Sequence, residues 1–469
     1  MDKGTAIRSV PLHCVPSLAS VAGQAVSGIG ASVSRERRSP PAENALARVT
    51  FEDWTKGRAV ASWGTNTGAD ALPFQSWRHF KEAFAPEIVA RAVAQSPIPV
   101  HRCLDPFGGS GTTALACQFL GVHPTSIEVN PFLADLIEAK LVSYDADALA
   151  RDLGILLRRA TVDRDGSVTS VVQLPETFIE PGVAGRWIFD RAVAARIAAL
   201  LGAIAALSDE HHRRLFRVLL GGVLIDVSNV VINGKGRRYR RGWEQRTRDP
   251  QMVADRFSAA ACQAIREIHR YGRRACQTYQ IRRGDCRTAL AEPAPCELAV
   301  FSPPYPNSFD YTDVYNIELW VLGYLTDGRS NQALRSATLC SHVQAGRDFP
   351  GAPAGSPTLD HTLARLANRR AALWDRRLPA MVGGYFADLL HVLAQMRRSI
   401  ARRGTVWMVV GDSSYAGVRI ETAAIISELA PDIGWRVGPV EPCRSMRASA
   451  QQGGRFDLAE TLIVLSRGD

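Results

Sequence analysis

The stretch VHRCLDPFGGSGTTALACQFLG, residues 100–121, decides the fold of this chain. It begins as a short apolar run, passes through a turn with three glycines and continues as an apolar helical pattern. The segment PTSIEVN, residues 124–130, then has the character of a second buried strand. A strand, a tight turn, a helix and a second strand, in this order, predict one unit of a parallel, doubly wound α/β sheet.

Strand patterns return in the second half of the chain, with helical patterns between them. Between the two groups of strands, residues 131 to about 276 are mainly helical by periodicity. Strands that alternate with helices favour one mostly parallel sheet that carries a large helical insertion. The later strand patterns are TYQIRRGD (278–285), ELAVFS (297–302), TVWMVVGDS (405–413), WRVGPVE (435–441) and ETLIVLSR (460–467).

The composition restricts the environment and the partners of the chain. Its 469 residues carry a formal net charge of +10, with a pI of about 9.3, which favours a polyanion, nucleic acid before membrane. The nine cysteines form no CxxC pair, and the start of the chain shows no signal peptide, so we expect a reducing, cytoplasmic environment. No run approaches the ~20 apolar residues of a membrane span.

Three acidic or glycine-rich strand ends predict a cofactor site. Gly108, Gly109 and Gly111 let the backbone approach a ligand closely. Their spacing matches neither GxGxxG nor a phosphate-binding P-loop. Glu128, at the end of the second strand, can accept hydrogen bonds from ribose hydroxyls, and Asp285 can accept one from an adenine amino group. Each acid alone is more typical of a solvated strand end. Together they favour S-adenosylmethionine over NAD or ATP.

The segment LAVFSPPY, residues 298–305, ends a buried strand on two prolines that cannot donate to a sheet. A rigid carbonyl and a serine hydroxyl at that point can accept a hydrogen bond from an exocyclic amine of cytosine or adenine. This aims the nitrogen lone pair at a methyl donor. An aromatic ring beside them can stack on a flipped-out base. The candidate catalytic residues are Ser302, Pro303, Pro304 and Tyr305.

Taken together, DPFGGSGTT, IEVNP, GDCRTAL and SPPY resemble the amino-methyltransferases of DNA, over residues 75–140 and 278–467. These enzymes transfer a methyl group from S-adenosylmethionine to N4 of cytosine or N6 of adenine. The resemblance implies a seven-stranded, Rossmann-like methyltransferase sheet. The segment FKEAFAPEIVARAV, residues 80–93, is similar to one that closes over the methionine end of the cofactor. The implied cofactor-binding residues are Phe80, Lys81, Phe84, Asp105, Pro106, Phe107, Gly108, Gly109, Gly111, Thr112, Thr113, Glu128, Val129, Asn130, Asp285, Cys286 and Ser302.

The first residue of the SPPY tetrapeptide bears on the substrate. In the family that the chain resembles, cytosine-N4 enzymes typically carry serine there, whereas adenine-N6 enzymes carry Asp or Asn. Ser302 therefore favours N4 of cytosine, with N6 of adenine as the alternative. An RNA methyltransferase and a non-catalytic nucleic-acid-binding subunit are more remote alternatives. A C5-cytosine enzyme is rejected because Cys296 precedes the strand and no glutamine follows it.

The insertion contains a basic, aromatic segment, NGKGRRYRRGWEQRTR, residues 233–248. Arginines bind phosphates and can read guanine, and aromatic rings can stack or wedge between bases, so the segment is a candidate for recognition of double-stranded DNA. A solvated basic loop is the alternative. A restriction or defence protein is a further possible partner. No metal site is expected, because His211 and His212 lack acid or cysteine neighbours at ligand spacing. The candidate DNA-binding residues are Lys235, Arg237, Arg238, Tyr239, Arg240, Arg241, Trp243, Arg246 and Arg248.

These patterns divide the chain into four parts. We expect a disordered arm (1–48), a cofactor-binding half of the catalytic domain (49–145), a helical insertion for target recognition (146–276) and a catalytic half with a mobile loop at about 327–360 (277–469).

Overall fold

The computed structural model describes residues 48–60, 63–64, 71–79, 83–160, 174–233, 236–447 and 457–468. All of them belong to one compact unit that begins at Ala47. The predicted arm, residues 1–48, lies outside the described residues except for its last position. None of the helices in the described part of the chain is long and apolar enough to cross a membrane.

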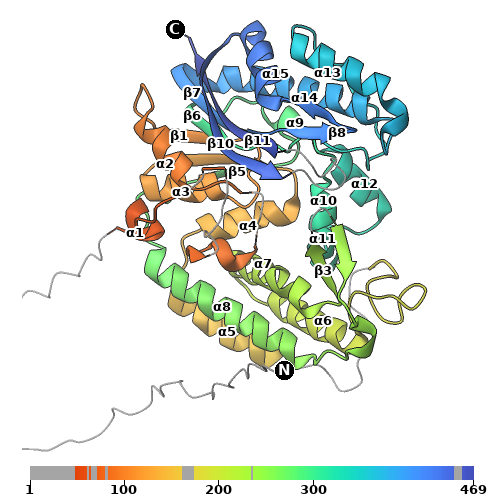
Figure 1. Cartoon of the computed structure of the whole chain (residues 1–469). Helices are drawn as coiled ribbons and strands as arrows, with labels where there is room; N and C mark the ends of the chain where they lie inside the picture. Colours follow the sequence, from red (N-terminus) through yellow and green to blue (C-terminus); the bar gives the residue numbers. More distant parts are fainter. Residues whose placement is uncertain are drawn as a thin grey trace, which may run out of the picture. The chain divides into compact units, whose positions relative to one another are not determined.

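A seven-stranded sheet forms the centre of the unit (Figure 1). Its strand order is β10-β11-β7-β6-β1-β2-β5, and all neighbouring pairs are parallel except those that β11 makes with β7 and β10. This confirms the predicted doubly wound, mostly parallel, Rossmann-like sheet. The strands are β1 (Arg102–Asp105), β2 (His123–Glu128), β5 (Gln280–Arg283), β6 (Cys296–Phe301), β7 (Ile400–Gly411), β10 (Trp435–Arg447) and β11 (Asp457–Arg467).

Side chains alternate between the two faces of the sheet and enter two separate buried clusters. Leu298 and Val300 of β6 lie in the cluster shared with α2, α3, α4 and the insertion, whereas Ala299 and Phe301 lie in the cluster shared with α9 and α13–α15. Both faces are therefore covered, as a parallel sheet requires. These helices are α2 (Glu87–Ala94), α3 (Thr112–Leu120), α4 (Pro131–Leu141), α9 (Cys286–Ala289), α13 (Pro357–Asn368), α14 (Leu378–Ser399) and α15 (Thr422–Leu429).

The strand order reverses between β1 and β6. From β1 the chain proceeds to β2 and β5 on one side, and later returns to β6 on the other. Cys103 pairs with Leu298 and Leu104 with Ala299, so the two strands end side by side. Ligands of doubly wound sheets bind in the crevice at such a switch point.

The insertion is mainly helical, as predicted, and its helices lie below the sheet in Figure 1. Its basic segment begins in a small hairpin of β3 and β4, for which the sequence analysis predicted no strands. Asp135 on α4 ties the insertion to the sheet, because it forms ion pairs with Arg217 of α7 (2.6 Å) and Arg283 of β5 (2.7 Å). The elements are α5 (Ala146–Arg159), α6 (Arg191–Ala205), α7 (Glu210–Val227), β3 (Val230–Asn233), β4 (Gly236–Tyr239), η3 (Trp243–Gln245) and α8 (Gln251–Tyr271).

Helix α12 (Gly328–Ser336) and the beginning of α13 occupy part of the segment that we expected to be a loop, residues 327–360. Asp327 caps α12: its side chain accepts a hydrogen bond from the Ser330 amide, and the Ser330 side chain bonds back to the Asp327 backbone. The mobility of this segment stays a prediction. The remaining elements are α1 (Phe51–Thr55), η2 (Gln75–Trp77), α10 (Tyr311–Val314), α11 (Asn316–Val321), η4 (Arg370–Ala372), β8 (Ser413–Tyr415), β9 (Val418–Ile420) and η5 (Ala430–Ile433).

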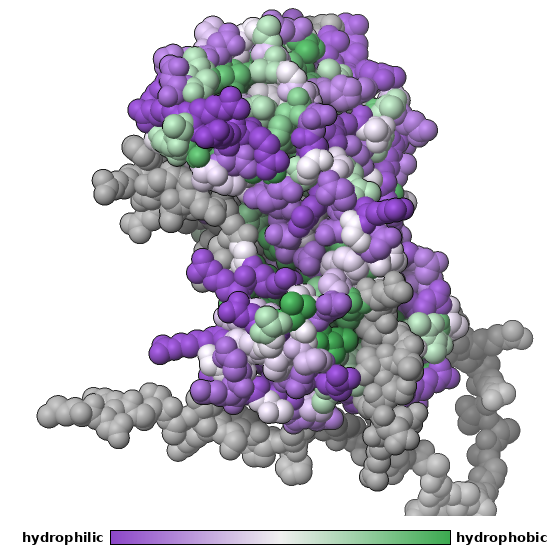
Figure 2. Space-filling view, turned by 90° about the vertical axis from the view of Figure 1, so that its right-hand side faces the viewer, coloured by the Kyte–Doolittle hydropathy of each residue, from purple (hydrophilic) through white to green (hydrophobic). Residues whose placement is uncertain are grey.

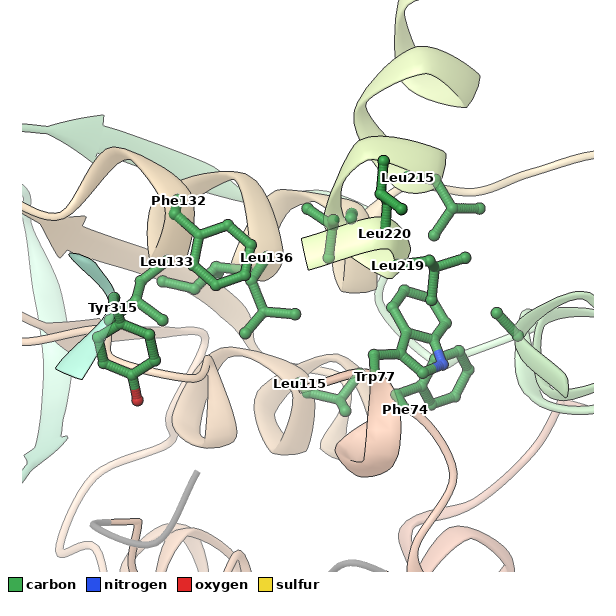
Figure 3. Packing of buried hydrophobic residues seen from close by; sticks show 14 of the residues in the cluster. Phe74, Trp77, Leu115, Phe132, Leu133, Leu136, Leu215, Leu219, Leu220 and Tyr315 are labelled. Atoms are coloured by element: carbon green, nitrogen blue, oxygen red, sulfur yellow. The ribbon is translucent and has the colours of Figure 1, made fainter. Parts of the chain in front are cut away.

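An aromatic segment before the sheet joins it to the insertion. Phe74 and Trp77 pack among leucines of α7 beside Leu115 of α3 (Figure 3). Glu267 of α8 accepts hydrogen bonds from the Trp77 indole (2.8 Å) and the Phe74 amide (2.7 Å). The approach to α7 is close at Gly222, where a Cβ atom would lie 2.2 Å from the Trp77 carbonyl oxygen.

Gly222→Ala should therefore destabilise the protein, because α7 must move away from backbone that cannot rotate aside. We expect a loss of about 1–3 kcal/mol in the free energy of unfolding, measured by urea denaturation. The control is Gly202→Ala on α6, where nothing lies within 4 Å of the new Cβ atom. It should stabilise the helix by about 0.5–1 kcal/mol. Equal stability of the two variants would contradict this packing.

Candidate active site

A cavity of about 370 Å³ lies at the carboxyl ends of β1, β2 and β6. Residues after β1 and at the end of β2 form one side, and the SPPY tetrapeptide forms another. The switch point thus brings the predicted cofactor and catalytic residues together. The predicted residues that line the cavity are Phe84, Asp105, Pro106, Phe107, Gly108, Gly109, Thr112, Thr113, Glu128, Val129, Asn130, Cys286, Ser302, Pro303, Pro304 and Tyr305.

The glycine turn is held against β2 and α4. The Gly108 amide donates to the Ile127 carbonyl (2.9 Å), and a Cβ atom at 108 would lie 2.6 Å from the Ile137 side chain. Gly111 has φ +81° and caps the start of α3, a conformation that favours glycine. It does not line the cavity, so its role in the structure is to shape the turn.

Two buried carboxyl groups line the cavity beside this turn. Glu128 is 7% exposed and accepts hydrogen bonds from the Gly109 amide (2.7 Å) on one oxygen and the Asn130 amide (2.8 Å) on the other. Asp105 accepts one from the Phe107 amide (2.9 Å). Burial raises the pKa of each carboxyl to about 7. Each Glu128 oxygen retains a lone pair with which it can accept a further hydrogen bond from a ligand.

Asn130 supplies a hydrogen-bond donor, whereas the two carboxyl groups supply acceptors. Its Oδ1 atom caps α4 by accepting from the amides of Phe132 (3.0 Å) and Leu133 (3.3 Å). Its Nδ2 atom is buried and has no hydrogen-bond partner within the described residues. A buried donor without a partner is costly, and a polar ligand in this cavity would supply the missing acceptor.

Besides Gly111, Asp285 is the predicted cofactor residue in the described part of the chain that does not line the cavity. The Asp285 side chain is not part of the cavity lining, because the Arg287 guanidinium binds it (2.7 Å). Its neighbours Gly284 and Cys286 line the cavity instead. Phe80 and Lys81 lie outside the described residues.

The SPPY tetrapeptide presents a serine whose hydroxyl is already oriented. Ser302 Oγ lies 2.9 Å from the Val409 carbonyl of β7 and donates to it, which leaves its lone pairs available as acceptors. The Tyr305 hydroxyl donates to Glu460 of β11 (2.7 Å).

The sequence analysis missed Glu460 and Arg444, which both line the cavity, as well as the wall formed by residues within 307–312 and 337–342. Glu460 had a signal in the sequence, because it is an acid at the start of the apolar run ETLIVL. Arg444 and the wall had no comparable signal.

The basic segment of the insertion divides into two kinds of residue. Arg240 donates to the carbonyls of Ser228 (3.1 Å) and Ile225 (2.9 Å), and the Trp243 ring is buried against Tyr239 and Trp187. The Arg248 guanidinium donates to Asn229 Oδ1 (3.2 Å) and to the Asp226 carbonyl (3.4 Å), and the Arg248 backbone amide donates to the Asp190 carboxylate (3.0 Å). Lys235 lies outside the described residues. The exposed arginines are Arg237, Arg238, Arg241 and Arg246.

Of the eight candidates in the described part of the chain, four arginines are exposed and therefore accessible to a polyanion. The β3–β4 hairpin that carries two of them lies on the right in Figure 1, and the described surface of the face shown in Figure 2 is mainly hydrophilic. The eight cysteines that the structure describes are free thiols, and the described residues contain no cluster of three potential metal ligands.

Comparison with known proteins indicates the chemistry. No family model matches the chain. It is 24% identical over 444 residues to Type II methyltransferase M.AvaI of Nostoc sp., with 87% of this chain and 88% of the relative covered. It is 20% identical over 469 residues to Type II methyltransferase M.BsoBI of Geobacillus stearothermophilus, with 88% of each chain covered. A shorter match, 31% over 80 residues, covers 17% of this chain and 15% of Type II methyltransferase M.MjaII of Methanocaldococcus jannaschii.

Similarity over most of the chain to methyltransferases supports a methyltransferase enzyme. Together with the Rossmann-like sheet, it implies S-adenosylmethionine as the methyl donor. The buried carboxyls and the unpaired Asn130 amide fit such a ligand, which carries hydroxyl donors, an ammonium group and a carboxylate.

The raised pKa of Glu128 makes stability depend on pH. In the unfolded chain this acid ionises near pH ~4.3, whereas in the folded protein it keeps its proton up to about pH 7. Its contribution to stability is therefore lost as pH rises between these values. Glu128→Gln should show a smaller decrease in the free energy of unfolding between about pH 5 and pH 8. Urea denaturation measures this, with the exposed Glu176→Gln as a control that keeps the wild-type slope. A wild-type slope in Glu128→Gln would contradict the shift.

Proposed function

We propose that this protein is a DNA methyltransferase that transfers a methyl group from S-adenosylmethionine to N4 of a flipped-out cytosine. The observation that carries the proposal is the single cavity that contains both the Glu128 carboxyl and the Ser302 hydroxyl. One side of it suits an adenosine-bearing ligand, and the other suits the amine of a base.

In this proposal the cofactor-binding residues contact different groups of S-adenosylmethionine. Glu128 accepts hydrogen bonds from the ribose hydroxyls, and Asn130 Nδ2 donates to an acceptor of the ligand. Asp105 lies on the same side of the cavity and suits an ammonium group, which favours its ionised form. When bound, S-adenosylmethionine supplies an electrophilic methyl group on a sulfonium ion.

The base residues act on the nitrogen nucleophile. An exocyclic amine is a weak nucleophile because its lone pair is delocalised into the ring. Ser302 Oγ, with its proton directed to Val409, accepts a hydrogen bond from that amine and orients its lone pair. Pro303 and Pro304 hold the backbone carbonyls in place, and the Tyr305 ring offers a surface for stacking.

Ser302 in place of Asp or Asn favours cytosine over adenine. Adenine N6 is the second candidate, because the same geometry suits both amines. The relatives are Type II methyltransferases, and the net charge of +10 suits a nucleic acid as the partner. A companion restriction nuclease or another defence protein belongs among the proposed partners.

Product analysis tests the proposal directly. The pure protein is incubated with S-adenosylmethionine and unmethylated DNA of mixed sequence, and the nucleosides are identified by mass spectrometry. We expect 4-methylcytosine. 6-Methyladenine would overturn the base assignment but keep the reaction, and no methylated base would overturn the function.

Ser302→Ala tests the role of the hydroxyl. Loss of one hydrogen bond of about 1.4 kcal/mol in the transition state should lower the single-turnover methylation rate about tenfold, with DNA affinity largely retained. Ser427→Ala on α15, whose hydroxyl bonds within its own helix, is the matched control. An unchanged rate in Ser302→Ala would remove this serine from the mechanism.

The exposed arginines of the insertion should bind phosphates. The triple variant Arg237→Gln, Arg238→Gln, Arg241→Gln should weaken DNA binding and flatten the plot of log affinity against log salt. The expected change in slope is about 0.9 for each phosphate that the variant no longer neutralises. Arg151→Gln, at an exposed position of α5, is the control for charge alone. Equal salt slopes in the triple variant and the control would place the DNA elsewhere.

A further inference from the structure

Glu460 of β11 is a buried charged group for which the proposed function has no use. Its side chain is 3% exposed, yet it lines the same cavity as Ser302. The antiparallel register of β10 and β11 places it opposite Arg444, whose Nε atom donates to Oε2 (2.6 Å). A Cβ atom at Gly64 would lie 1.9 Å from Oε2, so this backbone lies directly against the carboxylate.

A chain of hydroxyl groups connects this carboxylate to the serine. Ser302 Oγ lies 3.3 Å from the Tyr305 hydroxyl oxygen and can donate to it, and Tyr305 donates to Glu460 Oε1 (2.7 Å). The Ser302 proton can thus turn from the Val409 carbonyl, 2.9 Å away, toward Tyr305. Every donor in the chain can point away from the substrate and toward Glu460.

Methylation of an exocyclic amine creates a need for such a path. The reaction forms a carbon–nitrogen bond and breaks the carbon–sulfur bond, whose electron pair stays on sulfur. The nitrogen then carries a positive charge, because it has given its lone pair to the methyl carbon. It regains neutrality by losing one of its two protons, and this proton needs an acceptor.

We propose that Glu460 is this acceptor, and that the proton reaches it through Ser302 and Tyr305. The amine proton passes to Ser302 Oγ as the serine proton passes to the Tyr305 oxygen and the tyrosine proton passes to Glu460 Oε1. The two hydroxyls end the step as they began, and Glu460 ends it as a neutral acid that releases its proton after turnover. This inference rests on the proposed amine methylation.

The groups around the chain of hydroxyls from Ser302 to Glu460 suit these roles. Burial and the neighbouring Glu460 raise the pKa of Tyr305 well above its usual value, so the phenol is neutral before and after the step. It therefore accepts one proton as it gives up another, and does not act as a base. The ionisable groups that face Glu460 within the described residues are Tyr305, Arg444 and Cys443. Arg444 balances the negative charge while Oε1 remains directed at Tyr305. The cavity acids Asp105 and Glu128 instead accept from backbone amides.

Glu460→Gln tests the relay, because the amide keeps a hydrogen-bond acceptor but takes up no proton. We expect the single-turnover rate of methylated-base formation to fall about 10²-fold, with the S-adenosylmethionine affinity measured by calorimetry unchanged. Glu441→Gln is the matched control, since Glu441 lies on β10 in a surface ion pair with Arg91.

Tyr305→Phe is the second variant, since it keeps the ring and removes the middle hydroxyl. It should slow the reaction about as much as Glu460→Gln, and the double variant should be no slower than either. A Glu460→Gln rate within threefold of wild type would overturn the relay alone. Absence of any methylated base from the wild-type protein would overturn the proposed function and the relay with it.

Discussion

The parallel pairing of β1 with β6 is the constraint on which the site depends. One strand ends in the glycine turn and the other in SPPY, and their register places both ends at the same edge of the sheet. The two segments are almost 200 residues apart in the chain. Neither alone would make a methyltransferase: the turn offers a place for a nucleoside, and the tetrapeptide offers acceptors for an amine.

The cavity brings together carboxyl groups whose ionised forms water would otherwise stabilise. Burial raises the pKa of Asp105 and Glu128 to about 7, so both are poised to ionise when a ligand supplies hydrogen-bond donors or positive charge. Glu460, in contrast, has Arg444 as a built-in partner. Two acids that await a ligand and one that is already paired correspond to the two sides of the proposed site, the cofactor side and the side where we propose that the proton leaves.

Short sequence patterns predicted the residues of the candidate site whose positions depend on local structure. The glycine turn, Glu128 and SPPY were readable because strand ends, glycines and prolines carry short-range signals. Contacts between segments that lie far apart in the chain could not be predicted from the sequence. Glu460 meets Arg444 only through the register of the antiparallel β10–β11 pair. Asp285 is bound by an arginine two residues further on, which its place after a strand does not reveal.

The basic segment shows the same limit. Its charge pattern was evident, but only the folded structure separates the exposed Arg237 from Arg240, which binds carbonyls at the end of α7. Trp243 was expected to face DNA, yet it packs against Trp187. Aromatic residues in a basic segment can serve the core as well as a ligand, and a sequence pattern alone does not distinguish the two.

The central claim is that one cavity at the β1–β6 switch point holds the methyl donor next to SPPY. A crystal structure of the protein with S-adenosylhomocysteine tests this most directly. The account predicts ribose oxygens within about 3 Å of the Glu128 carboxyl and the sulfur atom on the side of the cavity that faces Ser302. A ligand bound outside this cavity, or one whose sulfur points away from Ser302, would contradict it.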